Sequence, residues 1–124
     1  MPKARPKHLN LFVIKQPLPA IMSILHRVSG VFLFLFLALL LWLLQESLMS
    51  PASFDHMRSV ASHPLMKLLI IVMVWSYLHH LFAGLRHLAF DLHVGAELGV
   101  ARASSVAVMV ASLALTAVAA VAIW

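Results

Sequence analysis

The chain contains no cysteine, and only 10% of its 124 residues are charged. Without thiolates it cannot ligate an iron–sulfur cluster, attach haem covalently, bind haem through a thiolate or form a disulfide. Any metal on this chain must therefore be held by histidine, methionine or carboxylate side chains. Hydrophobic residues make up 63% of the sequence, whereas a soluble domain carries about 25% charged residues. The composition indicates one membrane domain, residues 1–124, of the all-α class.

Basic residues are concentrated before the first apolar run, which four of the nine precede: Lys3, Arg5, Lys7 and Lys15. Lys and Arg are enriched in the cytoplasmic segments of membrane proteins, so this tail is expected inside. The tail is too long and polar, and the following apolar run too long, for a cleaved signal peptide. Nothing beyond the net charge of +5 supports nucleic-acid binding.

Three apolar runs predict membrane-spanning helices at about residues 21–49, 64–90 and 104–124, after a cytoplasmic tail at 1–20. Each run is long enough to cross a hydrocarbon layer of about 30 Å, which needs about 20 residues. The first loop carries one arginine balanced by one aspartate, whereas Arg86 and Arg102 flank the second loop. This bias predicts the N-terminus and the second loop inside, and the C-terminus outside, in a bacterial inner membrane.

The second run ends in a cluster of ionisable residues, which at membrane depth indicates a functional site. At about 100° per residue, His80 and His87 lie within about 20° of each other on one helical stripe. Gly84 lies between them and leaves a notch where a flat ring could approach. Imidazole is a common axial ligand of haem iron, and His80 is the deeper of the two. Arg86 and His87 lie about 10 Å nearer the inner surface and suit haem propionates.

The neighbouring His79 is offset by about 80° from His87 and should face elsewhere. We expect it at the membrane interface, hydrogen-bonded to headgroups or to a neighbouring helix, although ligation through His79 instead of His80 stays open. Because the chain offers one well-placed deep histidine, a second axial ligand would come from another subunit. Within the chain, His26 is the nearest rival, but it lies closer to the surface, at the depth of His87.

A second polar cluster stands at the start of the first run. Ser23, Arg27 and Gly30 follow i, i+4, i+7 spacing and share one face, and His26 is one step around the helix. The hydroxyl and guanidinium could hydrogen-bond a quinone carbonyl oxygen. The alternative is an arginine that extends to the lipid headgroups from the helix end. The predicted topology places both clusters at the inner side, so they should converge.

Together, the two clusters resemble the signatures of the cytochrome b membrane-anchor subunits of succinate dehydrogenase. The first signature corresponds to residues 23–30 (SILHRVSG) and the second to His80-x-x-x-Gly84-x-Arg86-His87-x-x-x-Asp91. Residues 5–11 (RPKHLNL) are similar to the start of that family. The resemblance covers nearly the whole chain.

The resemblance implies that His80 is the axial ligand of a haem b, with the second axial histidine supplied by a second membrane-anchor subunit. It also implies that His26, Arg27 and His87 surround the haem propionates, and that Ser23 and Arg27 line a pocket for the substrate ubiquinone. An iron–sulfur subunit and the second anchor would complete that pocket. Electrons from succinate would arrive through a flavoprotein and iron–sulfur clusters, so this chain would contribute no catalytic residue of its own.

Two other functions remain compatible with the residues. One is a cytochrome b subunit of another membrane dehydrogenase or hydrogenase, which usually carries both axial ligands in a longer chain. The other is a haem-free membrane subunit in which the histidines form a proton relay.

Overall fold

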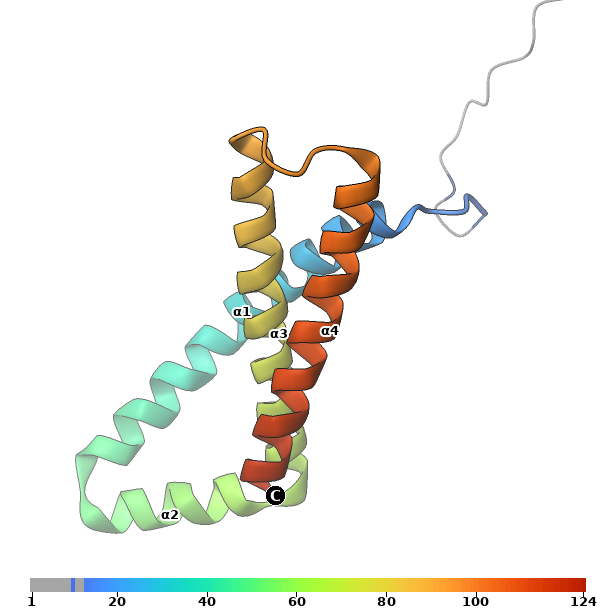
Figure 1. Ribbon diagram of the computed structural model, residues 1–124. Helices are drawn as coiled ribbons and strands as arrows, with labels where there is room; N and C mark the ends of the chain where they lie inside the picture. The colour runs from blue at the N-terminus through green and yellow to red at the C-terminus, as the bar shows by residue number, and fades with distance from the viewer. Residues whose placement is uncertain (1–9, 11–12) are drawn as a thin grey trace, which may run out of the picture.

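The computed structural model describes residue 10 and residues 13–124, and this part of the chain folds into four helices (Figure 1). They are α1 (Leu18–Met49), α2 (Pro51–Ser62), α3 (Pro64–Asp91) and α4 (Leu98–Ile123). No strand occurs in the described residues. By length and hydropathy, α1, α3 and α4 are each able to cross a membrane. The predicted all-α membrane fold with three spans is confirmed.

The segment between the first two spans was predicted as a loop, but it forms the helix α2. Ser50 caps it, because its hydroxyl accepts the amide of Ser53 at 3.1 Å and the Ser53 hydroxyl accepts the amide of Ser50 at 2.9 Å. Pro51 stands in the first turn, where a missing N–H costs nothing. These polar capping residues start a helix that the hydropathy pattern does not reveal.

The outer limits of the spans also differ from the prediction. α1 begins at Leu18, inside the tail predicted for residues 1–20, and most of that tail lies outside the described residues. α4 begins at Leu98 instead of residue 104, so Arg102 belongs to the helix and not to a loop. The connection from α3 is correspondingly short, and it turns through positive φ angles of 59° at His93 and 76° at Gly95.

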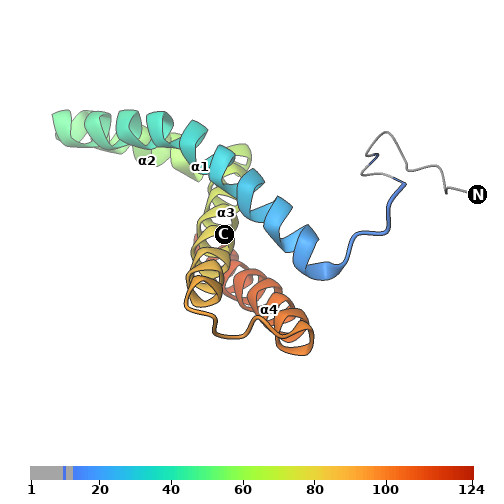
Figure 2. The same ribbon diagram turned by 90° about the horizontal axis from the view of Figure 1, so that it is seen from above.

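The helices are arranged as an antiparallel pair crossed by a long oblique helix. α3 and α4 lie side by side, and α1 crosses α3 at a large angle (Figures 1 and 2). α2 runs across the end of the molecule and joins the far end of α1 to the start of α3 (Figure 1). The first half of α1 therefore meets the second half of α3, and that crossing carries both polar clusters.

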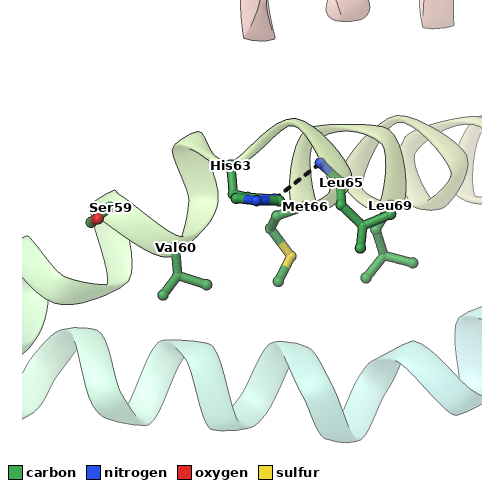
Figure 3. Close-up of a pocket in the computed structure, with 6 residues that line it drawn as sticks. All are labelled: Ser59, Val60, His63, Leu65, Met66 and Leu69. Atoms are coloured by element: carbon green, nitrogen blue, oxygen red, sulfur yellow. Dashed lines mark hydrogen bonds between the residues drawn. The ribbon is translucent and has the colours of Figure 1, made fainter.

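A pocket of about 440 Å³ lies at the corner between α2 and α3, far from this crossing (Figure 3). Its lining residues are Ser59, Val60, His63, Leu65, Met66 and Leu69. His63 is already engaged there, because its Nδ1 accepts the amide of Leu65 at 3.3 Å and so caps α3. At 1.5 Å per residue, the pocket is about 20 Å along α3 from His80 and belongs to the other end of the protein.

Small and hydroxyl-bearing residues bring α3 and α4 close together. The buried stripe of α3 consists of Ser76, His79, Ala83 and Arg86, and that of α4 of Ala101, Ser105, Val108, Ser112 and Thr116. The α4 hydroxyls bond to carbonyls of their own helix, for example Thr116 to Ser112 at 2.6 Å. Close packing of small residues is one way in which helices associate in lipid, so this face of α4 serves to pack against α3.

Arg86 ties the pair together, and its replacement is expected to destabilise the protein. Its Nε donates to the Ser104 hydroxyl at 3.0 Å and its Nη2 to the Ala101 carbonyl at 3.1 Å, while its guanidinium lies 4.4 Å from the centre of the Phe90 ring. A hydrogen bond from a charged group contributes about 1.5–3 kcal/mol. We therefore expect Arg86→Ala to lower the thermal denaturation midpoint of the purified complex by several degrees. Arg102→Ala, at an exposed position of α4, is the control. An equal midpoint in the two variants would show that the hydrogen bonds of Arg86 to α4 do not stabilise the protein.

Candidate functional site

The two polar clusters meet where α1 crosses α3. The imidazole of His26 from α1 stacks on that of His80 from α3, with ring centroids 4.1 Å apart and planes 17° from parallel. His26 also lies 5.1 Å from the ring of His87, at an angle of 46°. Residues separated by more than 50 positions thus form one group of three histidines. The predicted convergence of the clusters is confirmed.

A glycine on each helix makes room for the histidine of the other. A Cβ added at Gly30 would lie 2.9 Å from Cε1 of His80, closer than side chains tolerate. A Cβ at Gly84 would lie 3.6 Å from Nε2 of His26, an ordinary contact. The notch predicted at Gly84 is therefore real, and the ring that enters it here is the imidazole of His26. Gly30 is the more demanding of the two positions.

Hydrogen bonds hold His80 in one orientation. Its Nδ1 lies 3.0 Å from the main-chain carbonyl of His26 and 3.2 Å from the hydroxyl of Ser29. The Ser29 hydroxyl itself donates to the same carbonyl at 2.8 Å. Because a carbonyl oxygen can only accept a hydrogen bond, the ring proton is assigned to Nδ1, which donates to the His26 carbonyl. Nε2 is then the basic nitrogen, and it has no hydrogen-bond partner among the described residues.

This arrangement is that of a metal-binding imidazole. A histidine ligand binds through one unprotonated nitrogen, while the other donates to a carbonyl or carboxylate that fixes the tautomer and the ring orientation. His80 meets both conditions. Within the described residues, no three histidines or carboxylates are placed to hold a metal ion together. The described residues therefore offer one oriented imidazole, that of His80, and not a complete set of metal ligands.

The remaining predicted residues surround this group on α1 and α3. Arg27 is exposed and Ser23 half-buried, and neither side chain has a hydrogen bond or ion pair with a described residue. His87 is half-buried between His26 and Phe90, whose ring it meets edge-on at 6.4 Å. Donor groups of Ser23 and Arg27 are thus free on the surface of α1, next to the histidine group.

His79 does not lie where the sequence indicated. It was expected at the membrane interface, but its side chain is 0% exposed and stacks on Trp75 with centroids 5.3 Å apart. Neither ring nitrogen has a hydrogen-bond partner. The prediction that it faces away from His80 and His87 is correct, and the expected hydrogen bond to lipid headgroups or to a neighbouring helix is wrong.

Arg86 was expected to suit the haem propionates together with His87, but its guanidinium points to α4 and donates there to Ser104 and Ala101. The reason is helical phase. His79 and Arg86 are seven residues apart and form a stripe of their own, about 100° from that of His80 and His87. One stripe of α3 faces α4 and the other faces α1.

Sequence reasoning missed Ser29. It is 0% exposed and touches His80, yet no role was assigned to it. The available signal was a hydroxyl three residues after His26 and next to Gly30, within the polar cluster at the start of the first run. Such a residue needs a hydrogen-bond partner, because burying an unpaired hydroxyl costs about 1–3 kcal/mol in proteins.

Comparison with known proteins agrees with the resemblance seen in the two signatures. Residues 1–119 match the family described as succinate dehydrogenase/fumarate reductase transmembrane subunit. The succinate dehydrogenase cytochrome b556 subunit of Coxiella burnetii is 40% identical over 121 residues, which cover 97% of each chain. The subunits of the same name from Paracoccus denitrificans and Rickettsia prowazekii are 35% and 30% identical over 90% of this chain, covering 85% and 87% of their own lengths.

These matches extend across all three spans, and every relative named above is bacterial. The chain is a multi-pass protein of the bacterial inner membrane. It belongs to the family of succinate dehydrogenase/fumarate reductase transmembrane subunits.

Proposed function

We propose that this chain is the cytochrome b anchor subunit of a succinate:quinone oxidoreductase, in which His80 is an axial ligand of haem b. The observation that carries the proposal is the state of His80 at the crossing of α1 and α3. Its Nδ1 is held by the His26 carbonyl, and its Nε2 remains free to bind iron. When bound, haem supplies a one-electron redox centre close to the quinone site.

The second axial ligand is expected from a second anchor subunit. His26 is the other histidine close to His80, but the two rings stack face to face at 4.1 Å. Two imidazoles stacked this closely would not both bind the same iron, so His26 would not be the second ligand. His26, His87 and Arg27 are better suited to the propionates, because donors and cations pair with carboxylates.

Ser23 and Arg27 are expected to line the ubiquinone pocket. They lie four residues apart on α1, so their side chains share a face, and their donor groups are free. The Ser23 hydroxyl would donate to a carbonyl oxygen of ubiquinone. The Arg27 guanidinium would stabilise the negative charge that the quinone acquires during reduction, as prearranged donors do in other active sites.

The rest of the reaction takes place on partner subunits. This chain has no cysteine and cannot carry an iron–sulfur cluster, so a flavoprotein and an iron–sulfur subunit would oxidise succinate and deliver the electrons. Those soluble subunits would dock on the cytoplasmic side, where the predicted orientation places the start of α1. The chain then acts as an anchor and as one wall of the quinone site.

A reduced-minus-oxidised spectrum of membranes that contain the whole complex tests this proposal against a histidine proton relay. The contact between His26, His80 and His87 is the observation that favours the relay. A b-type band, together with succinate-dependent quinone reduction, is the expected result. Absence of the band in the wild-type complex would overturn the haem assignment and leave the relay as the better explanation.

The two glycines of the site give a matched pair of variants. In Gly30→Ala the new methyl group would lie 2.9 Å from the His80 ring, so the ring is expected to shift and its hydrogen bonds to weaken. In Gly84→Ala the methyl would make only an ordinary 3.6 Å contact with His26. We expect a several-fold loss of haem per complex, or a shifted b-type band, in Gly30→Ala and a nearly normal spectrum in Gly84→Ala. Equal spectra would show that Gly30 does not determine the position of His80.

A further inference from the structure

We propose that Ser29 is a positioning residue for the haem ligand: its hydroxyl supports the Nδ1–H tautomer of His80, which the His26 carbonyl fixes, and adjusts the electron density on the imidazole. The inference rests on the proposed function, in which His80 ligates haem iron. The residues that carry it are Ser29, His26 and His80, which meet at the crossing of α1 and α3.

The hydrogen bonds around Nδ1 of His80 accommodate only one tautomer. A serine hydroxyl has one proton to donate and two lone pairs. The proton of Ser29 is donated to the His26 carbonyl at 2.8 Å, so the oxygen presents a lone pair to His80 at 3.2 Å. Nδ1 therefore faces two acceptors, the Ser29 hydroxyl and the His26 carbonyl at 3.0 Å. A proton on Nδ1 satisfies both, whereas a lone pair there would be repelled by the carbonyl, which cannot donate.

Burial makes this contact strong and fixed in place. Met22 and Ser29 are the residues of α1 that are buried among those described. The exposed fraction of Ser29 is 0%, so water does not compete for its hydroxyl. Hydrogen bonds are electrostatically stronger in such a low-dielectric environment. The adjacent Gly30 lets the His80 ring approach α1 closely enough to reach the hydroxyl.

The consequence concerns the reduction potential. Acceptors on the outer nitrogen of a ligating histidine make the imidazole more basic, and such partners tune the bound metal. A more basic ligand favours the oxidised iron, which carries the higher positive charge. Loss of the Ser29 hydroxyl is therefore expected to raise the midpoint potential of the haem, without removing the ligand itself.

The test is a redox titration of the purified complex with all its subunits, comparing wild type, Ser29→Ala, Ser29→Thr and Ser112→Ala. Ser112 is the matched control, because its buried hydroxyl also donates to the carbonyl three residues earlier but contacts no histidine. We expect Ser29→Ala to raise the midpoint by at least about 30 mV. This is a threefold change in the redox equilibrium, since tenfold corresponds to about 59 mV for one electron. We also expect the g-values of the oxidised haem to change, Ser29→Thr to restore both properties and Ser112→Ala to match wild type.

The possible failures are distinguishable. If Ser29→Ala and Ser112→Ala both keep the wild-type potential and g-values, while His80→Ala loses the haem, Ser29 has no positioning role and the ligand assignment stands. If His80→Ala keeps a normal haem, the ligand assignment in the proposed function fails, and the inference for Ser29 fails with it. Should Ser29→Ala bind too little haem to titrate, haem content replaces the potential as the readout. Recovery of haem in Ser29→Thr then supports the proposal, and equal loss in both variants overturns it.

Discussion

The complex that carries His80→Ala is expected to lose its b-type absorption band. The substitution removes the one imidazole at the α1–α3 crossing whose Nδ1 is fixed and whose Nε2 is free. No neighbour can take its place, because His26 is seated over Gly84 on the other side of the stacked pair. A reduced-minus-oxidised spectrum, normalised to the flavin content of the complex, measures the loss.

His79→Phe is the matched control for that experiment. His79 is adjacent in sequence, but it is fully buried, stacks on Trp75 of the same helix and has no hydrogen-bond partner. Because neither of its nitrogens is hydrogen-bonded, a phenyl ring of similar shape removes no hydrogen bond and can even be stabilising. We expect a wild-type band in His79→Phe. A band that is lost in His79→Phe and kept in His80→Ala would move the axial ligand to His79.

The second large effect is expected at the quinone site, in Arg27→Ala and Ser23→Ala. Loss of a hydrogen bond from a charged group costs about 1.5–3 kcal/mol, and 1.4 kcal/mol corresponds to a factor of ten. Succinate-dependent ubiquinone reduction should therefore fall by about tenfold or more in Arg27→Ala, and by less in Ser23→Ala. Succinate oxidation with an artificial soluble acceptor should stay at the wild-type rate, because the flavin and the clusters lie on other subunits.

Arg102→Ala provides the control for a lost surface charge. Arg102 is exposed like Arg27, but it lies on α4 and not on α1. Its replacement should leave both activities unchanged. Wild-type quinone reduction in both Arg27→Ala and Ser23→Ala would contradict the quinone assignment. Arg27 would then be a cation that reaches from the helix end to the lipid headgroups.

Much of the architecture was predictable from local patterns in the chain. Runs of apolar residues longer than a bilayer requires identify three spans, and two short signatures identify the family. Helical periodicity alone placed His80 and His87 on one stripe and separated them from His79. The helix α2 was not predicted, because its start depends on the capping pair Ser50 and Ser53 and not on hydropathy.

The sequence alone therefore predicts the all-α membrane class, the three spans and the angular relation of residues within one helix. Periodicity does not determine which stripe of α3 faces which neighbour, since that depends on how whole helices rotate and pack against one another. Only the tertiary structure directs Arg86 and His79 to α4 and His80 to α1. It also brings Ser29 to a residue 51 positions away and places the His80 ring against Gly30. Those contacts depend on the crossing of two helices at ångström precision, which no local pattern encodes.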